Sequence, residues 1–326
     1  MEELLKELHE SDIEKVLHIT IRLKNYIITQ WDSVSDHDRR LFRNNILPIL
    51  FKYGREKKLR SLLEEIIGFV SDCDFPDNWP DLIDNLGKKC ESAISLSTPE
   101  ECEIVFIAVE TVESITASYC QREESVQIVM QIKPVVSEFA PKLLYLLKKL
   151  LDPRTSIDPT LSLSILKSIV NISKSIFFHD IPHEYLENLD MFFKYLIFII
   201  NEIPLPDVES SPKHRPHLVD ELKEEVVNVF TLCIQKYFED ISGEPNPDSA
   251  YAPVAKDTIQ NMTSAVWTNL SKMGLIRRFN NCAHASLRFL SCVVNSPSYS
   301  LFESKELLRK IIDDAILPSL MHGEVR

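Results

Sequence analysis

The sequence predicts an all-α protein, an α-α superhelix or solenoid in which about six helix pairs stack on one another. Apolar residues recur at the i, i+3, i+4 and i+7 spacing of amphipathic helices through nearly the whole chain, as in Leu143, Leu146, Leu147 and Leu150. Strand-like alternation is nowhere sustained. The 326 residues include only six glycines, under a third of the roughly 7% average. Few positions can therefore need positive φ, and glycine loops that cradle phosphate are almost excluded.

Caps and prolines mark where several helices begin. Pro80 opens one helix, Thr98-Pro99 supplies a cap and a first-turn proline for a second, and Pro253 begins a third. Periodicity and these marks predict helices near residues 12–31, 36–53, 56–72, 80–96, 99–120, 126–151, 158–178, 183–202, 217–241, 252–273, 276–296 and 303–320. The helices fall into pairs about 40–55 residues apart, close to the ~40–47 residues of HEAT and armadillo repeats. Each pair must stack on its neighbours to bury its apolar surface.

Net charge indicates which class of partner the protein binds, and cysteine usage indicates the cellular compartment. The net charge is −13 and the pI is about 5.2, so long-range electrostatics repel nucleic acid and anionic lipid and favour basic proteins. The seven cysteines are widely spaced within helical patterns, which is typical of reduced thiols in the cytosol or nucleus. The most apolar run, residues 191–200, contains Lys194 and is well short of the roughly 20 residues that span a bilayer. We expect no membrane insertion.

Motifs for enzyme chemistry are missing from the sequence. It contains no G-x-S-x-G, P-loop, H-E-x-x-H or paired C-x-x-C pattern. Adjacent carboxylate pairs such as Glu64-Glu65 point about 100° apart on a helix, which does not suit convergent acid–base work. The pairs His179 with His183 and His214 with His217 lack further ligands at metal spacing. We predict no catalytic residue, no metal and no cofactor. The proline-rich residues 204–216 are expected to form a solvated loop, with a contact or modification loop as the alternative.

Two motifs carry a family resemblance. Residues 74–82 read D-F-P-D-N-W-P-D-L, and the prolines should rigidify a corner while Phe75 and Trp79 pack between paired helices. Upstream, residues 23–27 read L-K-N-Y-I and are followed by Trp31. Together they resemble the D-F-P-x-x-W-P-D-L corner and the L/F-K-N-x-I…W signature of the karyopherin-β (importin-β) family of nuclear transport receptors, most closely the branch that re-exports importin-α. Weaker similarities to that branch lie at residues 175–178, 180–182, 264–270, 301–303 and 316–318.

The resemblance implies a domain organisation and a binding surface. Residues 1–35 would be a partial importin-β N-terminal homology region and residues 36–326 a HEAT-repeat solenoid without an intervening linker, within a longer receptor. In this family the second helix of each pair binds Ran-GTP on the inner surface, which corresponds here to helices 36–53, 80–96 and 126–151. The candidate Ran-binding residues are polar positions outside the apolar stripes, Arg39, Arg43, Asn44, Asp81, Asp84, Asn85 and Lys88, with Arg40 and Lys52 on the same face.

The resemblance also implies partners and a location. These are Ran-GTP, importin-α as cargo and nucleoporin FG repeats, for a receptor that shuttles between nucleus and cytoplasm through the nuclear envelope. Two alternatives stay open at this point. One is an import receptor of the same superfamily, from which Ran-GTP ejects cargo. The other is a HEAT-repeat scaffold of the phosphatase-regulatory kind, although such scaffolds have more uniform repeats and lack the corner at residues 74–82.

Overall fold

A computed structural model describes residues 2–10, 12–123, 125–205, 217–238, 252–273 and 280–302, together with Arg309 and Asp313. These residues form helices joined by turns, and none of them lies in a strand. The chain divides into two compact units. Unit 1 comprises residues 1–146 and 156–179, and unit 2 comprises residues 147–155 and 180–326. The all-α fold class predicted from the periodicity is confirmed, because the described residues of each unit form helices that pack on one another.

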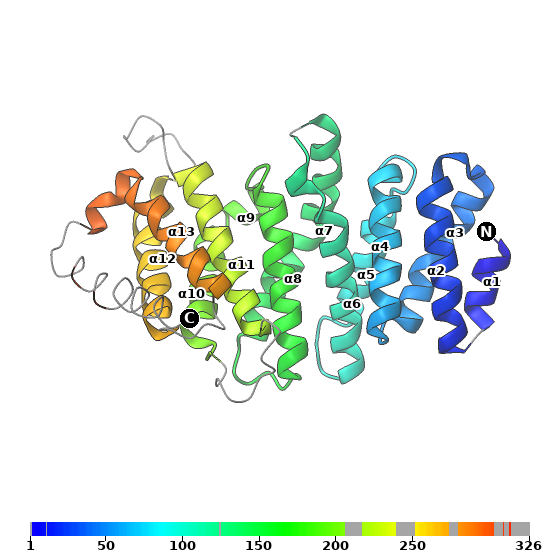
Figure 1. Ribbon diagram of the computed structural model, residues 1–326, viewed down its shortest axis with the longest axis horizontal. Helices are drawn as coiled ribbons and strands as arrows, with labels where there is room; N and C mark the ends of the chain where they lie inside the picture. Colours follow the sequence, from blue (N-terminus) through cyan, green and yellow to red (C-terminus); the bar gives the residue numbers. More distant parts are fainter. Residues whose placement is uncertain are drawn as a thin grey trace, which may run out of the picture. The chain divides into compact units, whose positions relative to one another are not determined.

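Unit 1 contains two sets of helices (Figure 1). The first helices of successive pairs, α2, α4, α6 and α8, pack side by side in chain order. The second helices are α3, α5 and α7, and α3 packs on α4 as α5 packs on α6. The bounds are α1 Glu2–Glu10, α2 Ile13–Gln30, α3 Asp36–Tyr53, α4 Lys57–Asp74, α5 Leu82–Ser92, α6 Pro99–Thr116, α7 Val126–Leu150 and α8 Pro159–Phe177.

Side-chain caps fix where four of these helices begin, and Asp12 is the cap of α2. Ser35 accepts a hydrogen bond from the backbone amide of Asp38 at the start of α3, and Thr98 accepts one from the backbone amide of Glu101 at the start of α6. Asp158 caps α8. Each cap satisfies one of the amides that a helix leaves without an internal partner at its N-terminus. The start predicted from Thr98-Pro99 is therefore confirmed.

Unit 2 repeats the paired arrangement. Its helices are α9 His183–Leu186, α10 Leu189–Glu202, α11 Leu218–Cys233, α12 Ala252–Met273 and α13 Asn280–Val294. A π-helical turn follows α11 at Ile234–Phe238, and a 3₁₀ segment follows α13 at Pro297–Phe302. α10 packs on α12 and α11 packs on α13. The phenylalanine rings of residues 193, 230 and 289 form a continuous buried contact between these helices, with centroids 6.5 and 6.1 Å apart.

Most predicted helices are confirmed to within a few residues, and three differences are informative. Helix α1 was not predicted, although Leu5 and Leu8 are 2% and 0% exposed and pack it on α2 and α3. The predicted helix 183–202 is two helices, α9 and α10. The predicted helix 80–96 ends at Ser92, and Leu96 has φ of +50°, a left-handed conformation that no helix continues through. The predicted helix 303–320, except Arg309 and Asp313, and most of the proline-rich loop lie outside the described residues.

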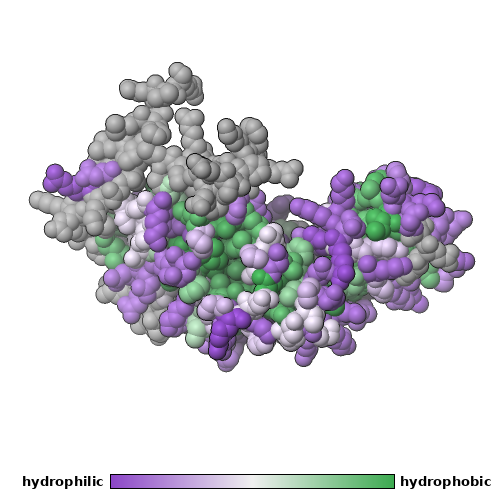
Figure 2. Space-filling view, turned by 90° about the horizontal axis from the view of Figure 1, so that it is seen from below, coloured by the Kyte–Doolittle hydropathy of each residue, from purple (hydrophilic) through white to green (hydrophobic). Residues whose placement is uncertain are grey.

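No helix among the described residues combines the length and the apolar character needed to cross a bilayer. The coloured surface at the N-terminal end of unit 1, on the right in Figure 2, is mainly hydrophilic. One compact hydrophobic patch interrupts it in this view. An exposed surface of this kind suits contacts with other proteins in water.

Candidate protein-interaction site

A tight corner, residues 74–82, joins α4 to α5 and contains two buried aromatic side chains. Phe75 and Trp79 are 3% and 2% exposed. The backbone amides of Asn78 and Trp79 donate to the carbonyl oxygen of Asp74, at 2.7 and 3.1 Å. The prediction that both aromatic residues pack between the paired helices is confirmed.

Asp74 ties this corner to the first helix pair. Its side chain is 1% exposed, and its Oδ1 atom accepts a hydrogen bond from the indole Nε1 of Trp31 at 3.2 Å. Arg43 Nη2 lies 3.0 Å from Oδ2, and Arg39 Nη1 lies 3.8 Å from Oδ1. A buried carboxylate needs such partners because an unpaired buried charge is strongly destabilising. The two motifs noted in the sequence therefore meet at one buried charge.

Aromatic and amide contacts extend the corner to three helix pairs. The rings of Trp31 and Phe42 meet edge to face with centroids 5.4 Å apart, and those of Phe42 and Trp79 do so at 6.2 Å. From α7, the buried Gln131 donates through Nε2 to the carbonyl oxygen of Phe75 at 2.7 Å. The corner thus fixes α3, α5 and α7 relative to one another within unit 1.

The charged groups of two predicted contact residues, Arg39 and Arg43, bind to this corner and to the segment before α3. Arg39 donates to the carbonyl oxygens of Trp31 and Val34, at 2.7 and 3.2 Å, and its side chain is 18% exposed. Arg43 donates to the carbonyl oxygen of Asn78, and its side chain is 14% exposed. Both residues hold the corner in this structure, and their contact with Ran stays a prediction.

Most of the candidates gather around a groove between α3 and α5. The groove has a volume of about 770 Å³, and five of the seven predicted residues line it: Arg43, Asn44, Asp81, Asn85 and Lys88. Its apolar wall consists of Leu47, Pro48 and Phe51 from α3. We call this the α3–α5 groove. The polar positions predict one side of this groove but not its apolar wall, although Pro48 within an otherwise helical pattern marks α3 as unusual at that point.

The polar residues of α5 are arranged as the helical pattern predicts. Leu82, Ile83, Leu86 and Cys90 are at most 1% exposed and pack inward. On the opposite face, Asp84 and Lys88 form an exposed ion pair at 2.6 Å, and Asn85 donates to Asp81 at 2.8 Å. The two candidate acids are thus already engaged with neighbours on the same helix, as is Lys88.

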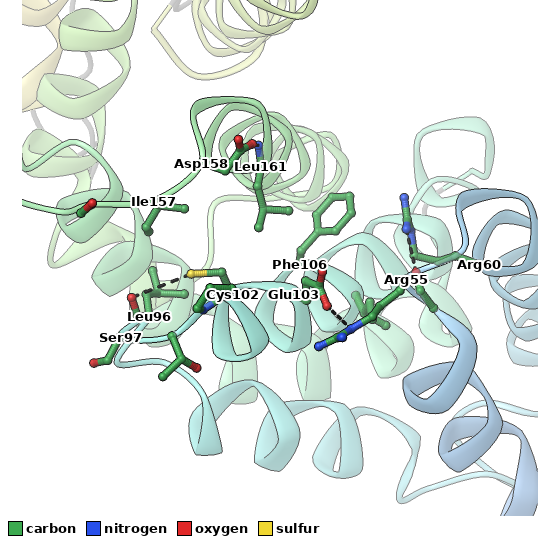
Figure 3. A pocket seen from close by; sticks show the side chains of 15 residues that line it. Arg55, Arg60, Leu96, Ser97, Cys102, Glu103, Phe106, Ile157, Asp158 and Leu161 are labelled. Atoms are coloured by element: carbon green, nitrogen blue, oxygen red, sulfur yellow. Dashed lines mark hydrogen bonds and ion pairs between the residues drawn. The ribbon is translucent and has the colours of Figure 1, made fainter.

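A second cavity lies where three turns between helix pairs come together (Figure 3). This turn pocket has a volume of about 420 Å³ and is lined by residues of the turns before α4, α6 and α8. Leu96, Phe106 and Leu161 form apolar parts of its wall, and the Arg55–Glu103 ion pair borders it. The pocket is therefore mostly apolar inside, with opposite charges at its edge.

Buried polar groups near the turn pocket join α4 to α6. Arg60 is 7% exposed, lies 4.6 Å above the ring of Phe106 and pairs with Glu110. Glu64 on the same helix is 6% exposed. Burial, reinforced by the negative charge of Glu110, raises the pKa of Glu64 to about 9. Folding therefore favours the protonated form of the Glu64 carboxyl. Among the described residues, no group of histidine, cysteine and carboxylate side chains is placed to hold a metal.

Unit 2 contains a buried lysine that joins three helices. Lys223 of α11 is 2% exposed, and its Nζ donates to the carbonyl oxygen of Ile200 and to Oδ1 of Asn269, at 2.8 and 2.9 Å. Burial lowers the pKa of Lys223 to about 8. The contacts connect α11 to the C-terminal end of α10 and to α12, so this lysine has a structural role within unit 2.

Sequence comparison decides the family. The sequence model of the Cse1 family matches residues 115–324, which is more than half of the chain. The chain belongs to the Cse1 family. Curated relatives of this Cse1-family chain include exportin-2 from Homo sapiens, 24% identical over 335 residues that cover 97% of this chain and 32% of the relative. Exportin-2 from Pagrus major is 23% identical with the same coverage.

A solved structure gives the same result for the fold. The exportin Cse1 in its cargo-free, cytoplasmic state superposes with a TM-score of 0.76 at 17% identity, covering 97% of this chain and 33% of that one. The Cse1-family chain therefore spans about a third of the length of these relatives. The resemblance noted from residues 23–31 and 74–82, to a karyopherin-β receptor of the exportin-2 type, is confirmed.

Proposed function

We propose that this chain is the N-terminal, Ran-GTP-binding portion of a nuclear transport receptor that exports importin-α. The observation that carries the proposal is the α3–α5 groove in a member of the Cse1 family. The groove lies between the second helices of two successive pairs, and five of the seven candidate residues line it. Rigid helices are better than loops at holding such a surface in one geometry.

The receptor would act by binding and not by catalysis. Ran-GTP and importin-α bind together in the nucleus, and both are released after GTP hydrolysis in the cytoplasm, so the receptor shuttles between the two compartments. If both ligands favour the same arrangement of the solenoid, each raises the affinity for the other by the same factor. Small rotations between stacked helix pairs add along a solenoid, which suits this kind of coupling.

Biolayer interferometry with the immobilised chain tests the proposal. The analytes are Ran loaded with a non-hydrolysable GTP analogue and Ran loaded with GDP, each with and without importin-α. We expect binding that is selective for the GTP form. Equal binding of both nucleotide forms, or none, would contradict the proposal.

The same experiment separates the proposal from its alternatives. An import receptor of the superfamily would lose its cargo when Ran-GTP is added, whereas an exporter holds the two together. A HEAT-repeat scaffold would bind neither nucleotide form selectively. The curated relatives are named exportins, which favours the export direction.

Nucleoporin FG repeats are a further proposed partner, and the turn pocket supports this contact. Its volume of about 420 Å³ and its apolar wall suit an aromatic side chain on an uncharged peptide (Figure 3). Leu161→Glu should weaken retention of the chain on immobilised FG repeats. Leu41→Glu on α3, outside the pocket, is the matched control. Equal retention of Leu161→Glu and wild type would remove the turn pocket from the proposal.

A further inference from the structure

Helix α3 contains a proline on its exposed face. Pro48 lies well inside Asp36–Tyr53, and the helix continues through it. Proline has no amide hydrogen, so the carbonyl oxygen of Asn44, four residues earlier, lacks the donor that would normally bond it within the helix. Asn44 and Pro48 are both exposed and both line the α3–α5 groove. The Asn44 carbonyl beside the groove therefore receives no hydrogen bond from residue 48.

Two side chains in the groove are also available to a partner. Lys89 projects from α5 and lies 5.7 Å above the ring of Phe51 on α3. In the part of the chain that the structure describes, no carboxylate pairs with Lys89, and the side-chain amide of Asn44 makes no hydrogen bond. The neighbouring polar groups differ, because Lys88 is paired with Asp84 and Asn85 with Asp81. The groove therefore offers an apolar wall, the Asn44 carbonyl and one unpaired cation.

We propose that Pro48 serves binding: it withholds the amide that would bond the Asn44 carbonyl and so keeps this carbonyl open as an acceptor for the protein that occupies the α3–α5 groove. The segment of the partner that fits places an apolar side chain against Leu47, Pro48 and Phe51. It donates a neutral N–H to the Asn44 carbonyl and sets a carboxylate on Lys89. A cationic side chain fits less well there because Lys89 has no carboxylate partner among the described residues, whereas Asp81, the carboxylate of the groove, already accepts a hydrogen bond from Asn85. This inference rests on the proposed binding of Ran-GTP.

The substitution Pro48→Ala tests the acceptor. Alanine restores an amide donor to the Asn44 carbonyl and is the best helix former, so the variant should melt no lower than wild type. Its affinity for Ran-GTP should nevertheless fall by roughly three- to tenfold, the factor that corresponds to one net hydrogen bond. Because the variant is not destabilised, misfolding cannot explain a loss of binding.

Pro141→Ala is the matched control for the proline. Pro141 is an exposed proline inside α7 that does not line the groove. Its replacement should affect melting in the same direction and leave the affinity for Ran-GTP unchanged. An unchanged affinity of Pro48→Ala, or an equal loss in Pro141→Ala, would overturn the proposed role of Pro48.

Lys89→Glu tests the partner's carboxylate. Reversing this charge should weaken Ran-GTP binding at least tenfold and reduce the salt dependence of the association rate. Lys58→Glu, an exposed lysine on α4, makes the same change in net charge away from the groove and should have little effect. Equal effects of the two variants would contradict the assignment of Lys89. If the wild-type chain binds neither form of Ran, the proposed function fails. If the wild-type chain binds Ran-GTP and the variants bind it equally well, only the proposed roles of Pro48 and Lys89 fail.

Discussion

The indole Nε1 of Trp31 donates to Oδ1 of Asp74 at 3.2 Å, across 43 residues of sequence. This hydrogen bond joins the residue that follows α2 to the last residue of α4, where the corner to α5 begins. Arg43 of α3 pairs with the same carboxylate. Because the corner sets where α5 starts, these contacts help to fix the separation of α3 and α5 and hence the α3–α5 groove.

Removal of the buried carboxylate should destabilise unit 1 strongly. In Asp74→Ala, the Arg39 and Arg43 guanidinium groups lose their common counter-ion while largely buried, at a cost of about 3–5 kcal/mol. Urea denaturation followed by circular dichroism measures the change. Asp77→Ala, at an exposed residue of the same corner, should stay within about 0.5 kcal/mol of wild type. A loss below about 1 kcal/mol in Asp74→Ala would show that the charge cluster does not hold the corner.

Glu64 should make the stability of unit 1 depend on pH. Its pKa is raised from 4.5 to about 9 by burial and by Glu110. The protonated form is therefore the one favoured by folding, and its contribution is fully present below pH 4.5 and is lost as pH rises through 9. Glu64→Gln stays neutral at every pH, so its free energy of unfolding should fall less between pH 6 and pH 9 than that of wild type.

Urea denaturation at the two pH values gives the comparison for Glu64. Glu65→Gln is the neighbouring control, since the Glu65 side chain is 52% exposed and its loss of charge should leave the wild-type pH dependence in place. Parallel changes in Glu64→Gln and wild type would mean that Glu64 is ionised in the folded protein at neutral pH.

Lys223 should have the opposite effect in unit 2. Burial lowers its pKa from 10.5 to about 8, so folding favours the neutral amine. That contribution is fully present above pH 10.5 and is lost as pH falls through 8. Lys223→Met should lack the gain in stability between pH 8 and pH 10. It should also lose about 2 kcal/mol, because the Ile200 carbonyl and the Asn269 amide oxygen lose their donor.

Thermal and urea unfolding of Lys223→Met, compared with Lys194→Met at an exposed position of α10, measure both effects. A variant with the stability and pH dependence of wild type would contradict a bonded, largely buried amine at residue 223.

Local patterns in the sequence predict most of the helices and the inward packing of Phe75 and Trp79, because caps, prolines and apolar spacing act over a few residues. Helix α1 is not predicted in this way because no cap or proline marks its start at Glu2. The break between α9 and α10 is not predicted either, because the apolar spacing continues through residues 186–189 although the backbone turns there.

The details of the site depend on contacts between distant residues. A helical stripe pattern places Arg39 and Arg43 outside the core, and their exposed fractions of 18% and 14% show that their long side chains fold back to Asp74 instead. No spacing rule links residues 31, 39, 43 and 74, because the fold alone brings them together. The groove itself follows from the placement of α3 beside α5, which the corner sets.

Binding of Ran to a chain with a blocked groove tests the central claim most directly. Asn44→Trp places a large side chain in the α3–α5 groove from an exposed position. Arg22→Trp introduces the same side chain at an exposed position of α2 that does not line the groove. Affinities of wild type and both variants for Ran in its GTP and GDP forms are measured by biolayer interferometry. We expect GTP-selective binding by wild type and Arg22→Trp, and a loss of affinity of at least tenfold in Asn44→Trp. Undiminished GTP-selective binding by Asn44→Trp would contradict this expectation, as would a wild type that does not distinguish the two nucleotide forms.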